Sequence, residues 1–270
     1  MHSLLGRITS AQIHKAPFPY VVIPNALDPD LCDALLRSFP PLSAITGGEP
    51  YVSNQRFSYT AAEALDNASL SREWRDMVSY HVSQSFFGEV LSRFKEHMQA
   101  QYPNISGHIG GVDSWRVGMR NKDTFTDRDI LLDAQISINT PVVDRASSVK
   151  ISHIDNEREL FAGLLYLRDP RDDSQGGDLE IYRAKRQPRF HGPRLIANRF
   201  VEKITSIPYT HNTFVFFLNT PHAIHGVSPR SVTRFPRLLF NVIGEVRDPL
   251  FDIRAYRESF LDKIIRHVWH

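Results

Sequence analysis

Residues 213–225 read Thr-Phe-Val-Phe-Phe-Leu-Asn-Thr-Pro-His-Ala-Ile-His, an apolar run followed by a turn and a histidine. The apolar part, 213–218, has the length and the aromatic and β-branched content of a buried strand. The turn residues at 219–221 end that strand, and a further short strand is expected from Ile224 to Val227. His225 is therefore expected at the start of a strand that follows a buried one.

Similar short segments, separated by turn residues, run through the second half of the chain. They are β-rich or alternating in character, and no helical pattern lies between them. This arrangement predicts an all-β sandwich or jelly roll and argues against a parallel α/β sheet. The other expected strands are 129–139, 149–154, 160–168, 178–183 and 237–244.

The first half of the chain carries helical patterns. A short strand at 18–24 precedes a helix that has Asp28 as its N-cap and a proline directly after it. Apolar residues recur at helical spacing over 71–98, where Gly88 is a candidate break between two helices. Residues 42–66 contain Gly, Pro, Ser and Asn, and are expected to form an irregular loop of a length often seen in lids.

We therefore expect a mainly β protein with flanking helices. The jelly-roll core is expected over 128–246, with a supporting helical region over 1–127 and a C-terminal helix over 247–270 packed outside it. No flexible linker divides the sequence, so residues 1–270 are predicted to form one domain.

The bulk composition is that of an ordinary globular protein. Hydrophobic residues make up 41% and charged residues 23% of the 270 residues, and the formal net charge is +2. This charge is too small to argue for a nucleic-acid partner, and no apolar run approaches the ~20 residues needed to cross a membrane. The single Cys32 excludes an internal disulfide framework and a zinc site made of several cysteines. A cytoplasmic location is the default expectation.

His153-Ile154-Asp155 supplies the rest of a candidate metal site. On a strand, positions 153 and 155 point to the same side, so an imidazole and a carboxylate can face one metal. With His225 they make two imidazoles and one carboxylate, which is the ligand set of the facial triad that holds non-haem Fe(II). His222 is the competing ligand, and His225 is preferred because of the sequence that follows it.

A guanidinium is expected close to this site. Arg234 follows His225 by nine residues, at the start of the expected inner strand 237–244. A buried guanidinium needs an anionic partner, and a carboxylate would satisfy it in bidentate geometry. Arg237 is the alternative, but it lies an odd number of residues from Arg234 and should face the other side of a regular strand.

Together these segments resemble the Fe(II)/2-oxoglutarate-dependent dioxygenases of the prolyl 4-hydroxylase-like group. The resemblance covers roughly residues 130–245 and rests on the order of several short motifs. These are His153-Ile154-Asp155, Gly176-Gly177-Asp178-Leu179, His225-Gly226-Val227-Ser228-Pro229 and then Arg234. The opening segment 17–24 is also similar to the start of many such enzymes, with less specificity.

The resemblance implies a double-stranded β-helix, a form of jelly roll, in which His153, Asp155 and His225 bind Fe(II). It implies that 2-oxoglutarate chelates the iron through its keto acid end and reaches Arg234 with its far carboxylate. Tyr166 stands where several relatives place a hydroxyl on that carboxylate, and an ordinary strand aromatic is the other interpretation. O2 is then the second cosubstrate, and succinate and CO2 are released.

Two further features bear on the chemistry. Asp155 argues against halogenation, because halogenases of the wider superfamily lack this carboxylate. Gln135, Ser137 and Asn139 alternate onto one face of strand 129–139, which commonly borders the cosubstrate pocket in this fold. Asn139 is the candidate cosubstrate contact there, with a solvent-facing polar strand as the alternative.

The basic segment 183–199 is the candidate substrate contact. It is rich in Lys and Arg, with few acidic residues to balance them. Arg183, Lys185 and Arg186 are expected to attract an anionic or carrier-bound small molecule, and a solvated surface loop is the alternative.

The leading hypothesis is an Fe(II)/2-oxoglutarate oxygenase that hydroxylates a small biosynthetic substrate. The sequence leaves open whether the protein forms a homodimer. A peptide or protein hydroxylase is the alternative, and an extended groove with a mobile loop at 42–66 would favour it. The alternative from another class is a non-catalytic metal-binding jelly-roll protein, which would not need Arg234. Neither a membrane nor nucleic acid is expected as a partner.

Overall fold

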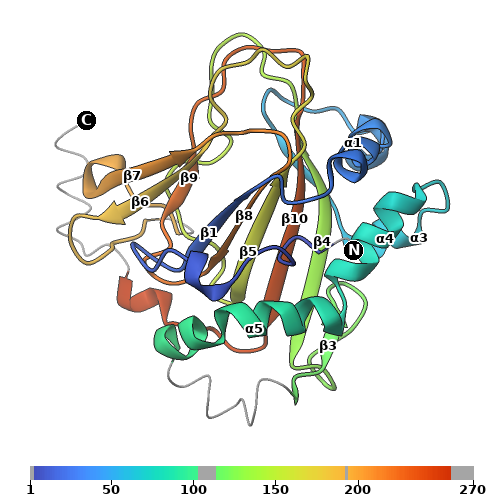
Figure 1. Cartoon of the computed structure of the whole chain (residues 1–270). Helices are drawn as coiled ribbons and strands as arrows, with labels where there is room; N and C mark the ends of the chain where they lie inside the picture. The colour runs from blue at the N-terminus through green and yellow to red at the C-terminus, as the bar shows by residue number, and fades with distance from the viewer. Residues whose placement is uncertain (1–2, 103–113, 192–193, 257–270) are drawn as a thin grey trace.

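The computed structural model describes residues 3–102, 114–191 and 194–256. Its core consists of a large sheet that faces a small one (Figure 1). The strands of the large sheet are β1 (Tyr20–Pro24), β2 (Arg56–Tyr59), β3 (Val117–Met119), β4 (Ile130–Asn139), β5 (Glu159–Tyr166), β8 (Thr213–Leu218) and β10 (Arg237–Val246). Those of the small sheet are β6 (Leu179–Ala184), β7 (Val201–Ile207) and β9 (His225–Val227).

Strands that are distant in sequence lie side by side. The large sheet has the order β1-β8-β5-β10-β4-β2, all antiparallel, with β3 pairing β4 in parallel, and the small sheet has the order β7-β6-β9. The predicted fold class, a mainly β jelly-roll core with helices outside it, is confirmed.

The inner faces of the two sheets share one apolar cluster. Leu179 and Ile181 of β6 pack there with Tyr166, Phe217 and Leu239 of the large sheet. Because side chains alternate along a strand, the intervening residues of β5, β8 and β10 point to the other face of the large sheet. The polar residues of β4 that were predicted to share a face lie on the inner one, since the apolar residues between them pack outside.

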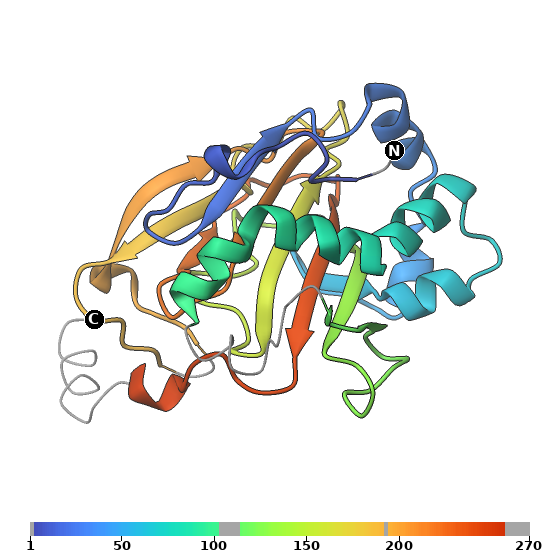
Figure 2. The same cartoon turned by 60° about the horizontal axis from the view of Figure 1, so that its bottom comes forward.

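Helices cover the outer face of the large sheet, and Figures 1 and 2 show the longest of them lying across its strands. Their apolar sides form one cluster with the outward-facing residues of β4, β5, β8 and β10. The helices are α1 (Pro29–Arg37), α2 (Leu42–Thr46), α3 (Ala61–Asp66), α4 (Arg72–His81) and α5 (Gln84–Gln101), and short 3-10 turns occur at Ser10–Gln12, Asn198–Phe200 and Ile253–Tyr256.

The start of α1 agrees with the sequence signal, whereas the break between α4 and α5 lies elsewhere than expected. Asp28 caps α1, because its carboxylate accepts a hydrogen bond from the Asp30 N–H. The break between α4 and α5 does not occur at Gly88, which lies inside α5. It occurs at Ser83, whose hydroxyl accepts from the Phe86 N–H and starts the second helix. The capping hydroxyl, and not the glycine, therefore sets this boundary.

The prediction of an irregular loop over 42–66 holds for 47–55 and is wrong for the rest of the segment. That rest forms α2, β2 and α3, and β2 pairs with β4 at the edge of the large sheet. Two other expectations need correction: 149–154 makes only an isolated bridge at His153, and β7 was not predicted. Of the expected C-terminal helix, residues 257–270 lie outside the described residues.

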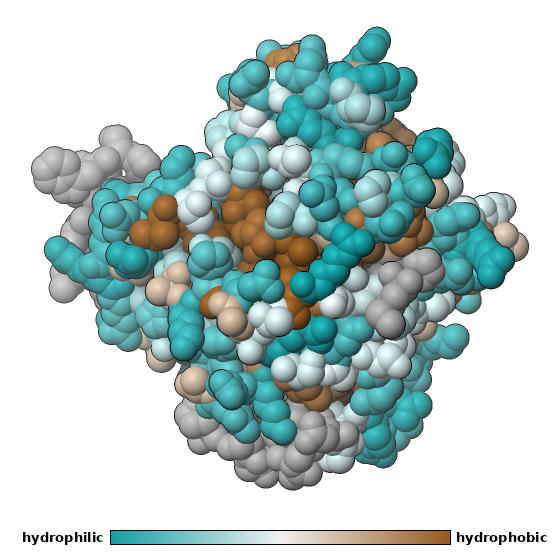
Figure 3. All heavy atoms as spheres, in the orientation of Figure 1, coloured by the Kyte–Doolittle hydropathy of each residue, from teal (hydrophilic) through white to brown (hydrophobic). Residues whose placement is uncertain are grey.

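No helix among the described residues is both long and apolar enough to span a membrane. On the face seen in Figure 3, hydrophobic side chains gather at the centre, over β1 and β8, and hydrophilic ones surround them.

Candidate metal centre

The structure brings the three predicted metal ligands together. His225 is the first residue of β9, and His153 pairs with it through two backbone hydrogen bonds of 2.9 Å, one in each direction. Asp155 follows on the same segment, with its carboxylate oxygens 3.6 Å from His153 Nε2 and 3.5 Å from His225 Nε2. One ligand atom from each residue lies within 4.8 Å of the others.

Hydrogen bonds at the back of each imidazole fix which nitrogen faces the centre. His153 Nδ1 lies 2.7 Å from the Ile151 carbonyl oxygen, and His225 Nδ1 lies 2.9 Å from the Ala223 carbonyl oxygen. A carbonyl only accepts, so each Nδ1 must carry the proton, which leaves each Nε2 with a free lone pair. This is the arrangement that orients metal-binding histidines.

Charge in this group matches a divalent cation. Burial lowers the pKa of His225 to about 4, with Asp155 opposing the shift, so the ring is neutral near pH 7. Burial alone would raise the pKa of the Asp155 carboxyl, but His225, His153 and Lys150 together hold it well below its usual range. Two imidazoles and one carboxylate are donors that Fe(II) accepts while leaving further coordination positions for other ligands.

A second group of polar side chains lies on the inner face of the large sheet. Asn139 is fully buried, as is Tyr166, and neither the Asn139 amide nor the Tyr166 hydroxyl has a hydrogen-bond partner among the described residues. Burial raises the pKa of Tyr166, with Arg237 opposing the shift, so its hydroxyl stays protonated and can donate. Buried polar atoms without partners are rare in folded proteins, so these atoms indicate a ligand.

Arg237, and not Arg234, belongs to this group. The Arg234 side chain is exposed and lies over the ring of Phe235. Arg237 is 3% exposed, and its guanidinium carbon lies 4.9 Å from the centre of the Tyr166 ring. Arg237 Nε donates to the Gly177 carbonyl oxygen at 2.9 Å, and Nη2 has no partner among the described residues.

Arg234 would point inward, and Arg237 outward, only if a regular strand began before Arg234. In fact β10 begins at Arg237, opposite Asn139 of β4, and the residues before it form bends around an isolated bridge at Thr233. Arg237 therefore shares its face with Leu239, which packs between the sheets, whereas Arg234 lies in the loop.

Gly176 and Gly177 place the backbone that holds Arg237. Both have positive φ, +75° and +78°, a conformation that side chains other than glycine rarely adopt. A Cβ on Gly176 would lie 2.0 Å from the Pro229 carbonyl oxygen. The two glycines thus allow their loop to approach the loop at Pro229 closely. In this position the Gly177 carbonyl accepts the hydrogen bond from Arg237 and orients its side chain.

Sequence reasoning missed Arg56, on β2. Arg56 and Asn139 face each other across β2 and β4, and Asn139 faces Arg237 across β4 and β10, so the three residues form one row. The alternation of polar and aromatic residues in Arg-Phe-Ser-Tyr at 56–59 is the strand signal that would have found it.

The structure does not bring the predicted basic residues to the metal ligands. Arg183, Lys185 and Arg186 are exposed on β6 and after it. Arg183 Nη1 lies 4.0 Å from Glu202 Oε2 on the neighbouring strand β7, and Lys185 Nζ donates to the Arg199 carbonyl oxygen. The competing histidine, His222, is also exposed and lies outside the cluster of ligands.

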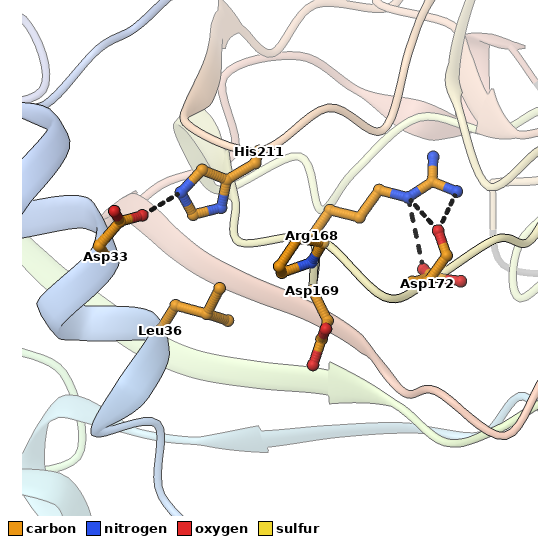
Figure 4. A pocket seen from close by; sticks show the side chains of 7 residues that line it. Asp33, Leu36, Arg168, Asp169, Asp172 and His211 are labelled. Atoms are coloured by element: carbon orange, nitrogen blue, oxygen red, sulfur yellow. Dashed lines mark hydrogen bonds and ion pairs between the residues drawn. The ribbon is translucent and has the colours of Figure 1, made fainter.

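A separate surface cavity of about 250 Å³ lies beside α1 (Figure 4). His211 points across it to Asp33, with a nitrogen–oxygen distance of 3.3 Å, and Arg168 extends to Asp172. Asp172 is fully buried and also binds Arg230, at 2.7 Å. None of the predicted site residues lines this cavity.

Comparison with known proteins gives the site a family. Residues 145–242 match the family model described as the 2OG-Fe(II) oxygenase superfamily. No curated protein matches the sequence.

Several solved structures are similar in fold. A prolyl 4-hydroxylase from Phytophthora capsici aligns with a TM-score of 0.50 at 11% identity, over 93% of this chain and 66% of that one. A Pseudomonas putida prolyl-4-hydroxylase aligns with a TM-score of 0.45 at 11% identity, over 85% and 93%. The epimerase SnoN, solved with Fe3+, alpha ketoglutarate and nogalamycin RO, aligns with a TM-score of 0.48 at 11% identity, over 89% and 86%.

The matched segment contains all three residues of the cluster, His153, Asp155 and His225, as well as Arg237. The match gives a 2OG-Fe(II) oxygenase domain over residues 145–242, and the protein is an oxidoreductase that uses Fe(II), 2-oxoglutarate and O2.

Proposed function

We propose that this oxygenase hydroxylates a small biosynthetic molecule. In this reaction the substrate, 2-oxoglutarate and O2 give the hydroxylated product, succinate and CO2, so that one oxygen atom enters the product and the other enters succinate. His153, Asp155 and His225 would hold the iron, which with its cosubstrates supplies an oxidant able to attack a C–H bond. Asp155 supports hydroxylation over halogenation because it fills the position that a halide would need.

Arg237 is proposed to anchor 2-oxoglutarate through its far carboxylate. The observation that carries this assignment is the set of buried atoms without partners: Arg237 Nη2, the Tyr166 hydroxyl and the Asn139 amide. A carboxylate would accept hydrogen bonds from all three groups, and the guanidinium would compensate its charge. Arg234, which is exposed, is not proposed for this role.

The segment 42–66 supports a small substrate over a peptide. A peptide hydroxylase was expected to have a mobile loop there, next to an extended groove. Instead most of the segment forms α2, β2 and α3, and only 47–55 is irregular. β2 is hydrogen-bonded to β4, and the Asp133 carboxylate accepts from the Ala61 N–H at the α3 N-terminus at 2.9 Å.

The test is the visible charge-transfer band that Fe(II) and 2-oxoglutarate form without oxygen. Asp155→Ala should abolish the band by preventing iron binding. Arg237→Gln should weaken 2-oxoglutarate binding by about 10–100-fold, since hydrogen bonds to a charged group contribute about 1.5–3 kcal/mol. Arg234→Gln is the matched control and should leave the dissociation constant unchanged. A loss of affinity in the control, with none in Arg237→Gln, would reverse the assignment.

With oxygen present, 2-oxoglutarate consumption without substrate separates an oxygenase from a non-catalytic metal-binding protein. The wild type should release succinate slowly, and Asp155→Ala should not. Iron binding with no succinate from either protein would refute the proposed function.

A further inference from the structure

Arg56 is a second cation in the row of residues that contains Asn139 and Arg237. It lies on β2, two strands away from Arg237 in the same row, which corresponds to about 10 Å between their Cα atoms. Its side chain faces inward, because Ser58 has the same strand parity and places its hydroxyl 3.0 Å from the Ser137 hydroxyl on the inner face. The intervening Phe57 packs on the outer face with the helices.

No carboxylate neutralises Arg56 among the residues that the structure describes. Its guanidinium makes one long hydrogen bond, from Nε to the Ser58 hydroxyl at 3.5 Å. Burial and the nearby charge of Arg237 lower the pKa of Arg56 to about 10, with Asp155 and Tyr166 opposing the shift. The group stays charged at neutral pH, and a half-buried guanidinium that lacks an anion is a site where an anionic ligand is the expected partner.

The cosubstrate already has a binding group for each of its ends. One carboxylate of 2-oxoglutarate is assigned to the iron and the other to Arg237, so Arg56 remains for another anion. The gradient of exposure agrees: Arg237 is 3% and Asn139 0% exposed, whereas every residue of β2 is partly exposed. Arg56 therefore lies toward the edge of the large sheet, where β2 is the last strand, and within electrostatic reach of both Asp155 and Arg237.

We infer that Arg56 binds an anionic group of the primary substrate, a carboxylate or a phosphate, and so selects organic acids for oxidation. This inference rests on the proposed function and concerns the same pocket. The planar guanidinium fork matches either group, and the Ser58 hydroxyl, which accepts from Arg56 and Ser137, can donate its own proton to the anion. The exposed residues Arg183, Lys185 and Arg186 then lose the role of primary anion contact.

The test uses three probes of similar shape: phenylacetate, phenyl phosphate and the neutral phenylacetamide. Each is titrated anaerobically into the enzyme loaded with Fe(II) and saturating 2-oxoglutarate, and the shift of the charge-transfer band is followed. In the wild type, at least one of the anions should bind about tenfold or more tightly than the amide. The two anions distinguish a carboxylate from a phosphate.

Variants of Arg56 locate the effect. Arg56→Gln should abolish the preference for the anion while leaving the 2-oxoglutarate dissociation constant within about twofold. Arg56→Lys, which keeps the charge, should retain part of the preference, and Arg234→Gln should retain all of it. Thermal unfolding of each variant checks that the fold is intact, and Arg56→Lys keeps the test valid where Arg56→Gln does not fold.

Three results would overturn the inference. Equal binding of the acids and the amide to the wild type would show that no anion is selected. A loss of 2-oxoglutarate affinity in Arg56→Gln as large as in Arg237→Gln would assign Arg56 to the cosubstrate. Absence of the band in the wild type, before any probe is added, would refute the proposed function itself and this inference with it.

Discussion

Two buried groups of charged side chains lie close together in this molecule and differ in how they are satisfied. Around Asp172, Arg230 donates to the carboxylate at 2.7 Å and to the Ser174 hydroxyl at 2.9 Å, and Arg168 donates to the backbone of both residues. On the inner face of the large sheet, Arg237 has only the Gly177 carbonyl, and Asn139 makes no side-chain hydrogen bond to the described residues.

Both groups flank the same ring. The guanidinium carbons of Arg230 and Arg237 lie 5.8 Å and 4.8 Å from the centre of Tyr209. The first group carries its own anion and, apart from one unpaired nitrogen of Arg230, is internally matched. The second lacks an anion among the described residues. The difference teaches that burial of an arginine alone does not indicate a binding site, whereas a buried arginine that lacks an anion does.

The largest expected effect on stability comes from removing the anion of the first group, the Asp172 carboxylate that pairs with Arg230. Asp172→Asn leaves Arg230 buried without an anion, so the free energy of unfolding should fall by about 3–5 kcal/mol, measured by urea denaturation. Asp169→Asn is the control, because Asp169 pairs with the exposed Arg171 at the surface and should change stability by less than about 1 kcal/mol. Equal losses in the two variants would mean that the buried group has no special role.

A smaller effect on stability is expected at Gly176, in the loop that holds Arg237, the arginine without an anion. Gly176→Ala would place a methyl group against the Pro229 carbonyl at positive φ, and should lower stability by about 1–3 kcal/mol. It should also weaken 2-oxoglutarate binding, since the next residue holds Arg237. In Gly88→Ala, where a Cβ meets nothing within 4 Å, stability should instead rise by about 0.5–1 kcal/mol. A neutral Gly176→Ala would remove the argument for the close approach.

Removing the unmatched arginine should hardly affect the protein without ligands. Arg237→Met deletes a buried charge that has no anion, so the free energy of unfolding should change by less than about 1 kcal/mol. Fe(II) with 2-oxoglutarate at about 100 times its dissociation constant should stabilise the wild type by about 2.7 kcal/mol and the variant far less. A large loss of stability without ligands would show that Arg237 supports the fold as Asp172 does.

The smallest effect is expected in the basic segment 183–199, whose predicted contacts form the exposed basic rim. Replacing Arg183, Lys185 and Arg186 together by serine should change stability by less than about 0.5 kcal/mol, because all three are exposed. Any weakening of phenylacetate binding should appear at low salt and vanish at ~1 M, where screening is strong. A loss that persists at high salt and equals that of Arg56→Gln would return the anion site to the rim.

The fold and the cluster of His153, Asp155 and His225 could be predicted from the sequence because their signals are local or periodic. The buried strand at 213–218 is a continuous apolar run, and it matches β8. Strand parity places His153 and Asp155 on one side, and the structure brings both into one cluster with His225. Their segment is not a strand of either sheet, but bridges from His153 to His225 and to Leu195 keep it extended.

The choice of arginine could not be read in the same way. It depended on where β10 begins, and the boundary of a strand depends on pairing with β4, which the sequence does not encode locally. The same holds for β2: its four residues are strand only because Asn139 and its neighbours lie beside them. Arg56 was therefore missed together with its strand.

The backbone pairing of His153 has a consequence for the kinetics of the centre. The same segment also pairs with residues 194–196 on its other side, through the Ile154 N–H to the Arg194 carbonyl and the Ile196 N–H to the Ser152 carbonyl. His153 thus lies in the middle of a small ladder, not at the end of a loop. The amide protons of His153 and His225 should exchange with deuterium slowly and together, and iron bound by these residues should enter and leave without the backbone opening.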